Sequence, residues 1–263
     1  MSSFVGSSAA QGKSDGQGPP VEIVDTAAAM SKVVDALKDL PTTPPSLYID
    51  LEGENLSRHG TISLLQIFVM PTRSTYLIDA FTLRAVAFLT RGECGHHLKD
   101  ILESSAIPKV IFDVRTDSDA LYGHFQINLA GIQDLQLMEL ATRTFSRRCV
   151  NGLAKCLERD ARMTLTEKLD WQKTKEKGRR LFAPECGGSY QVFDVRPLPT
   201  EIVAYCAQDV QILPRLWSDY SGKPTVSWEA RVSEATEDSV KLSQSASFNG
   251  QGRHMALAPS GWA

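Results

Sequence analysis

Two acidic residues in the first half of the sequence have the spacing of a metal-ion site. Asp50 and Glu52 lie within an apolar run that begins at Leu47 and predicts a buried strand. Residues two apart on a strand point to the same face, so both carboxylates leave the segment on one side. Carboxylates in such a segment need a cation partner, and hard divalent ions such as Mg2+ and Mn2+ take oxygen ligands. The alternative is an edge strand whose acidic face is simply solvated.

A second acidic group follows the apolar segment that starts at Lys109. Asp117 falls in the first turn of a helix predicted from Thr116 to Phe125, where the helix dipole favours a negative charge. Asp113 and Asp119 lie nearby, but only one of the three acids is expected to face the pair on the earlier strand. Taken alone, Asp117 is equally well explained as an ordinary residue at the start of a helix.

The third group is a tyrosine and an acid near the end of the main apolar pattern. Residues Glu201 to Leu216 predict a helix, and within it Tyr205 and Asp209 are four residues apart. That spacing places both side chains on one helix face, one above the other. A surface pair would show the same spacing, so Tyr205 and Asp209 indicate a functional site only in combination with the other two acidic groups.

The elements that must position these residues follow from hydrophobic periodicity and from the proline and glycine breaks. Strands and helices alternate after an initial run of strands, which predicts a mixed sheet with helices packed on its faces. The predicted strands are Val21–Val24, Leu47–Glu52, Ile62–Met70, Thr75–Asp79 and Lys109–Val114, with further short elements at Ile127–Ala130 and Asp134–Leu140. The predicted helices are Ala27–Leu37, Leu83–Leu89, Leu98–Leu102, Thr116–Phe125, Glu201–Leu216 and Ser227–Ser245.

Taken together, the three groups resemble the motifs of the DEDD superfamily of 3'-5' exonucleases, in its tyrosine-bearing, ribonuclease D-like branch. The segments that carry the resemblance are YIDLEGENLSRHGTISLLQI, KVIFDVRTDSDALYGHFQINLAGIQDLQLMEL and LPTEIVAYCAQDVQILPRLW. The similarity extends from about Val21 to Tyr220. It implies an α/β, ribonuclease H-like fold, in which helices flank a central mixed sheet whose first three strands are antiparallel.

The resemblance also implies a chemistry. Asp50, Glu52, Asp117 and Asp209 would hold two Mg2+ or Mn2+ ions, and Tyr205 would orient the attacking water. The expected reaction is hydrolysis of the terminal phosphodiester bond of RNA or single-stranded DNA, with release of a nucleoside 5'-monophosphate.

The second motif departs from the family pattern. Family members often carry His-Asn or His-Ala where this chain has Phe112 and Asp113. Asp119 is therefore a second candidate for the acid of this motif. Side chains two residues apart on a helix point about 200° apart, so Asp117 and Asp119 cannot exchange roles without movement of the helix.

A basic stretch supplies the expected contacts to nucleic acid. Residues 141 to 180 contain twelve lysines and arginines against five acids, although the whole chain has a formal net charge of -3. Cations beside the aromatic residues Trp171 and Phe182 suit a single strand, whose phosphates they neutralise and whose bases stack on the rings. The alternative is a solvated helix with ordinary charge pairs. The candidate contact residues are Arg147, Arg148, Lys173, Lys177 and Arg179.

Composition sets the remaining expectations. The chain of 263 residues fits one domain with extensions: a disordered tail at residues 1–20, an exonuclease domain at residues 21–222 and a helical extension at residues 223–263. An odd number of cysteines without zinc spacing indicates reduced thiols. The absence of any secretory signal or apolar run of membrane length predicts an intracellular protein of the nucleus or cytoplasm, without a membrane partner. The sequence leaves the oligomeric state open.

A second function class stays open from the sequence. A relative of these exonucleases that has lost its metals would act as a nucleic-acid-binding or protein-binding adaptor with the same fold. Because all four acids and the tyrosine are present, the enzyme is the favoured interpretation.

Overall fold

The computed structural model describes residues 18–223 and 225–262. The predicted N-terminal tail therefore lies almost entirely outside the described residues. Within them, no helix is both long and apolar enough to cross a membrane.

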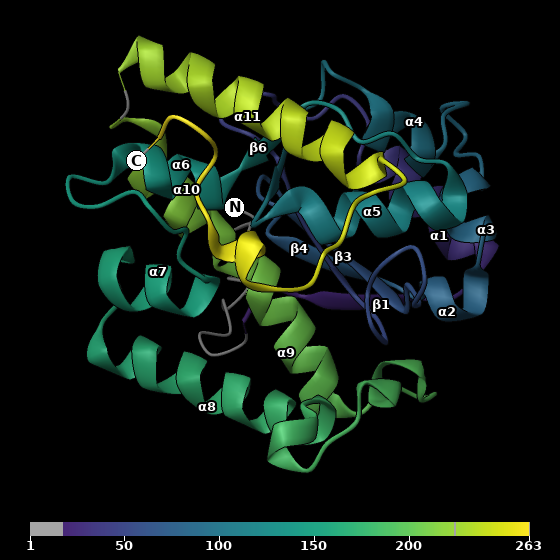
Figure 1. Cartoon of the computed structure of the whole chain (residues 1–263). Helices are drawn as coiled ribbons and strands as arrows, with labels where there is room; N and C mark the ends of the chain where they lie inside the picture. The colour runs from purple at the N-terminus through teal and green to yellow at the C-terminus, as the bar shows by residue number, and fades with distance from the viewer. Residues whose placement is uncertain (1–17, 224, 263) are drawn as a thin grey trace, which may run out of the picture.

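A six-stranded sheet in the order β1-β4-β3-β2-β5-β6 forms the centre of the molecule (Figure 1). Strands β2, β3 and β4 form an antiparallel meander, whereas β1, β5 and β6 each pair in parallel with a neighbour. This confirms the predicted mixed sheet with an antiparallel meander. The strand bounds are β1 Val21–Val24, β2 Leu47–Glu52, β3 Leu64–Val69, β4 Ser74–Ile78, β5 Lys109–Ile111 and β6 Ile132–Asp134.

Alternation along β2 assigns its side chains to two different layers. Ile49 and its alternating neighbours pack into the core formed with α1, α3 and α4. Tyr48, on the opposite face, packs with α6, α7 and α10. Asp50 and Glu52 share the face of Tyr48, as a period of two requires.

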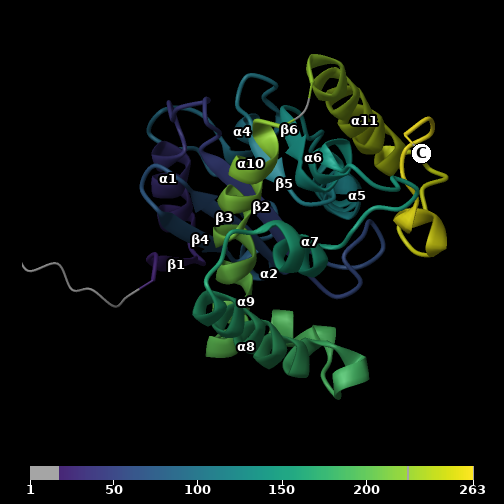
Figure 2. The same cartoon turned by 90° about the vertical axis from the view of Figure 1, so that its left-hand side faces the viewer.

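Helices cover both faces of the sheet, and α11 crosses over α5 at the top of Figure 1. Figure 2 shows α8 outside the sheet layers, beneath α9. The helices are α1 Ala27–Ala36, α2 Ala80–Leu83, α3 Val86–Leu89, α4 Leu98–Glu103, α5 Val114–Phe125, α6 Leu135–Thr142, α7 Leu153–Asp160, α8 Leu165–Phe182, α9 Thr200–Gln211, α10 Leu213–Ser221 and α11 Val226–Gln244. Short 3-10 helices cover η1 Pro184–Cys186, η2 Tyr190–Asp194 and η3 Arg253–Ala256.

Three sequence predictions of local structure are wrong in detail. The helix predicted from Glu201 to Leu216 is divided into α9 and α10, because Pro214 has no N–H to bond to the carbonyl of Val210. The helix predicted from Leu83 to Leu89 is interrupted at Arg84, whose φ is 53°. The segment from Ile127 to Ala130 is not a regular element.

Residues 245–262 return from the end of α11 across the front of α5 in Figure 1. The backbone carbonyl of Met255 accepts a hydrogen bond from Arg115 at 2.9 Å, and the side-chain amide of Gln251 donates to Asn55 at 2.9 Å. The C-terminal residues thus contact both the start of α5 and the loop that follows β2.

Candidate active site

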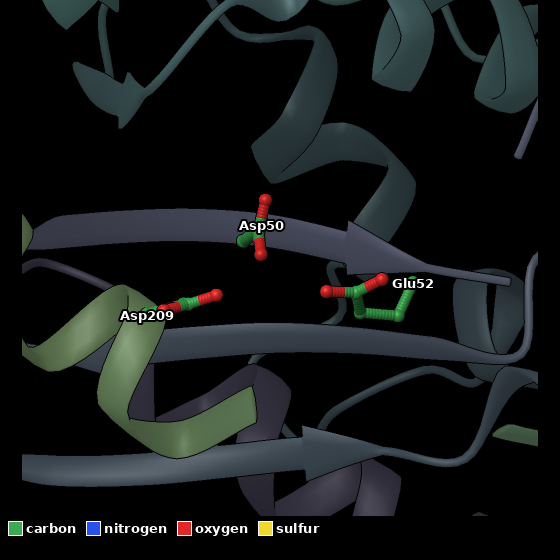
Figure 3. Close-up of side chains that lie close together, drawn as sticks. All are labelled: Asp50, Glu52 and Asp209. Carbon is green, nitrogen blue, oxygen red and sulfur yellow. The ribbon is translucent and has the colours of Figure 1, made fainter. Parts of the chain in front are cut away.

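Three carboxylates meet between the sheet and α9. One oxygen from each of Asp50, Glu52 and Asp209 lies within 4.8 Å of the other two. Figure 3 shows the carboxyl group of Asp209 directed from α9 toward the strand that carries the other two acids. Asp209 is buried, whereas Asp50 and Glu52 are partly exposed, so the cluster is open on one side. The residues that the sequence placed on a strand face and on a helix face are therefore brought together.

The packing of α9 explains this placement. Ile202, Cys206 and Val210 form its buried stripe, which holds the helix against the sheet. Tyr205 and Asp209 lie on the adjacent face, one turn apart. The ring of Tyr205 packs 4.9 Å from that of Phe182, measured between centroids. Phe182 also packs against Tyr190 and Phe193, so its ring serves the packing around Tyr205.

The structure separates the roles of the two acids on α5. Asp117 is 3 % exposed, and its pKa is raised by burial and then by the charges of nearby acids, among them Asp50, Asp113 and Glu52. Its carboxylate is not one of the three that lie within 4.8 Å of one another. Asp119 is committed elsewhere, because it forms an ion pair with Arg58 and accepts the backbone N–H of Arg58 at 2.9 Å.

Asp134, in the DLQ sequence of the second motif, fixes the start of α5. Its carboxylate accepts the backbone N–H groups of Asp113 and Val114, each at 3.1 Å, and that of Gln136 at 2.9 Å. Asp113 itself forms a two-point ion pair with Arg115, at 2.6 and 2.7 Å. These contacts set the direction of the helix that carries Asp117.

Sequence reasoning missed Lys175 as a site residue. The ammonium group of Lys175 on α8 donates a hydrogen bond to Asp209 Oδ2 at 2.7 Å and another to the Tyr205 hydroxyl at 3.1 Å. The sequence counted it only as one of twelve cations. The signal that could have found it is Gly178, three residues further along the same helix face. A Cβ at Gly178 would lie 2.7 Å from Tyr205 Cγ and Cδ2, so α8 and α9 are in close contact there.

Burial and mutual repulsion raise the pKa values of the clustered groups. Burial, together with the charge of Asp209, raises the pKa of Asp50 to about 7, and Lys175 opposes the shift. Burial and the neighbouring acids raise the pKa values of Glu52 and Asp117 well above the ordinary range. The same two causes raise the pKa of the Tyr205 phenol, so this group keeps its proton at neutral pH.

The donor set fits a hard divalent cation. Asp209 Oδ1 is buried and accepts no hydrogen bond from any residue that the structure describes. An unpaired oxygen of this kind is costly in a protein interior, and a bound cation removes the cost. Carboxylate oxygens are the ligands that Mg2+ and Mn2+ prefer.

The five candidate cations for nucleic-acid contact do not share one environment. Arg147 donates to the backbone carbonyl of Leu140 at 3.0 Å and stacks over Trp228, so it has a packing role. Arg179 pairs with Glu185 at 3.1 Å. The remaining three are exposed: Arg148, Lys173 and Lys177.

Comparison with known proteins gives a consistent result. Residues 21–220 match the model of a family described as 3'-5' exonuclease. None of the curated proteins matches the sequence.

Solved structures of similar fold include a Trypanosoma brucei RNase D complex with RNA U12. It has a TM-score of 0.71 and 22 % identity over 92 % of this chain and 77 % of that chain. RNase D of Escherichia coli, an exoribonuclease involved in structured RNA processing, has a TM-score of 0.58 and 18 % identity over 86 % of this chain and 51 % of that chain. NrnC of Brucella melitensis bound to pGG has a TM-score of 0.51 and 17 % identity over 87 % and 91 % of the two chains.

Proposed function

Since this chain belongs to the 3'-5' exonuclease family of the DEDD superfamily, we propose that it removes nucleotides one at a time from the 3' end of RNA or single-stranded DNA. The single observation that carries the proposal is the meeting of Asp50, Glu52 and Asp209 within 4.8 Å, on the two elements that bear the first and third motifs. Water would attack the terminal phosphorus, the bond to the 3' oxygen would break, and a nucleoside 5'-monophosphate would leave.

The acids are proposed as ligands for two ions of Mg2+ or Mn2+. Asp50, Glu52, Asp117 and Asp209 would hold them. Asp50 is close enough to the other three for their charges to raise one another's pKa values. When bound, such ions lower the pKa of a water molecule and offset the charge that develops on phosphate oxygens. The unpaired Oδ1 of Asp209 and the raised pKa of Asp50 support this assignment. A bound cation would pair with the oxygen and would lower the pKa of the carboxyl group.

Tyr205 has the geometry of a residue that orients water. Its hydroxyl lies beside the acids, and the ring is held by Phe182 and by the backbone of α8 at Gly178. Because burial keeps the phenol protonated, Tyr205 would act through its hydrogen bonds and not as a base. Exposed Arg148, Lys173 and Lys177 would neutralise phosphates of the strand.

The residues divide into an exonuclease domain at 21–222 and a C-terminal extension at 223–263. Packing of α11 against α5 supports a bracing role for this extension, since the carbonyl of Ser243 accepts a hydrogen bond from Arg58. Arg58 in turn binds Asp119 on the helix that carries Asp117.

The test is digestion of 5'-labelled single-stranded RNA and DNA with Mn2+, Mg2+ or EDTA. We expect a ladder that shortens from the 3' end only with metal, and its loss in Asp50→Asn. Asp238→Asn, at an exposed position on α11, is the matched control and should behave as wild type. If the oligonucleotide stays intact but remains bound to the protein, the exonuclease proposal is refuted and the nucleic-acid-binding adaptor becomes the favoured function.

A further inference from the structure

A lysine ammonium group lies inside the proposed metal site. Lys175 Nζ is 2.7 Å from Asp209 Oδ2 and 3.1 Å from the Tyr205 hydroxyl, and it lies 4.5 Å from the centroid of the tyrosine ring. The Lys175 side chain is 23 % exposed and that of Asp209 is 6 % exposed. This pair is thus largely desolvated, unlike the exposed ion pairs elsewhere on α8.

The local packing shows that this contact is built into the fold. Lys175 and Gly178 are three residues apart and therefore share a face of α8. The missing side chain of Gly178 lets that face approach the Tyr205 ring closely. A capping box between Thr164 and Glu167 fixes the start of α8, and Arg215 of α10 pairs with Glu167 at 2.5 Å. The helix is thereby anchored at its start and at its contact with α9.

The charge balance of the cluster is incomplete with lysine alone. One ammonium faces the three clustered carboxylates, and it satisfies only one oxygen of Asp209. Asp209 Oδ1 has no partner among residues 18–223 and 225–262. The single positive charge of Lys175 offsets only part of the negative charge of the three carboxylates. A divalent metal ion would offset more of it.

We propose that Lys175 is a built-in counter-ion that occupies the Asp209 side of the metal site in the metal-free protein and is displaced when divalent ions bind. The inference rests on the proposed function, because it needs the acids to be metal ligands. It has two consequences. Lys175 stabilises the metal-free fold, and it lowers the affinity of the site for metal because each binding event must break its contacts.

The size of the effect follows from the contact that is broken. A hydrogen bond to a charged group contributes about 1.5–3 kcal/mol, equivalent to roughly 10- to 100-fold in an equilibrium constant. Lys175→Met keeps most of the side-chain length and removes the charge. We therefore expect this variant to bind Mn2+ about 10- to 100-fold more tightly than wild type.

The experiment is calorimetric titration of the full chain with Mn2+, together with thermal unfolding in EDTA and in Mn2+. Lys175→Met should bind more tightly than wild type, melt at a lower temperature in EDTA, and gain more from added Mn2+. Arg180→Met is the matched control, since it removes an exposed cation from the same helix and should leave Mn2+ affinity unchanged. Equal or weaker Mn2+ binding by Lys175→Met would overturn the inference.

Two further variants keep the outcome decisive. If Lys175→Met does not fold, Lys175→Gln, which keeps a neutral donor, is judged by the same criterion. Asp50→Asn distinguishes a failure of the proposed function from a failure of the counter-ion inference. If wild type binds Mn2+ no better than Asp50→Asn, the proposed function fails. If wild type binds Mn2+ and neither Lys175 variant binds it more tightly, only the counter-ion inference fails.

Discussion

Substitution of Gly178 by alanine tests whether the contact between α8 and Tyr205 controls catalysis. The added Cβ would lie 2.7 Å from Cγ and Cδ2 and 2.8 Å from Cβ of Tyr205. Carbon atoms in favourable contact are about 3.5–4.0 Å apart, so the ring or the helix must shift by roughly 1 Å. The ring has little room to move, because Tyr205 is 5 % exposed and Phe182, four residues further along α8, packs 4.9 Å from it between centroids.

The expected effects on stability and on rate differ in size. Overpacking costs about 1–3 kcal/mol. Alanine in place of glycine in a helix returns about 1 kcal/mol, so the net loss of stability is about 0–2 kcal/mol. A misplacement of about 1 Å at a reacting centre can lower the rate about 100-fold. Gly178→Ala should therefore remain folded and lose most of its kcat.

The assay is single-turnover digestion of a labelled RNA oligonucleotide in Mg2+, combined with thermal unfolding of the same samples. A double-mutant cycle with Tyr205→Phe identifies the route of the effect. If the glycine acts by placing the hydroxyl of Tyr205, Gly178→Ala costs little further rate once that hydroxyl is absent. Wild-type kcat in Gly178→Ala would refute the reasoning. So would an equal loss of rate in both backgrounds.

Two further predictions concern acids and a lysine outside the three-carboxylate group. Asp117→Asn should lose metal-dependent turnover. Asp119→Ala should keep its kcat but lose about 1.5–3 kcal/mol of stability, because it leaves Arg58 without its ionic partner. Digestion assays and chemical denaturation of both variants test this. Loss of kcat only in the Asp119 variant would make Asp119, and not Asp117, the acid of the second motif. Burial lowers the pKa of Lys109 to about 7 from 10.5, so between these values the unfolded chain binds more protons and stability rises with pH. Denaturation of wild type and Lys109→Met from pH 6.5 to 9 should show this rise only in wild type, and parallel curves would contradict it.

The sequence is sufficient to predict the acids because their positions follow from simple periodicities. A period of two places Asp50 and Glu52 on one face of β2, and a spacing of four places Tyr205 one turn from Asp209. The tertiary structure adds only the distance between the two elements. The choice between Asp117 and Asp119 is different, because it depends on the partner that α5 meets. Arg58 comes from a loop 61 residues earlier, and nothing in the spacing of α5 predicts it.

The surroundings of Tyr205 could not be predicted, because they depend on one helix approaching another. Phe182 beside a basic stretch was predicted to stack on bases, yet its ring packs under Tyr205. Hydrophobic periodicity does not distinguish the lysines of α8, because it does not say which face of a polar helix meets a neighbour. Gly178 is the one hint in the sequence of α8, and the packed structure shows that it marks the face of closest approach.

The geometry of α8 separates the two roles that its lysines are proposed to have. Lys173 and Lys177 are four residues apart and share an exposed face, whereas Lys175 points about 200° away from Lys173 and reaches Asp209. A strand of nucleic acid bound along the exposed face would contact Lys173 and Lys177, whereas the proposed metal ligand Asp209 contacts Lys175. Because the two faces belong to one rigid helix whose position is limited by Gly178, the distance between bound phosphates and the acids is set by backbone packing and not by flexible side chains.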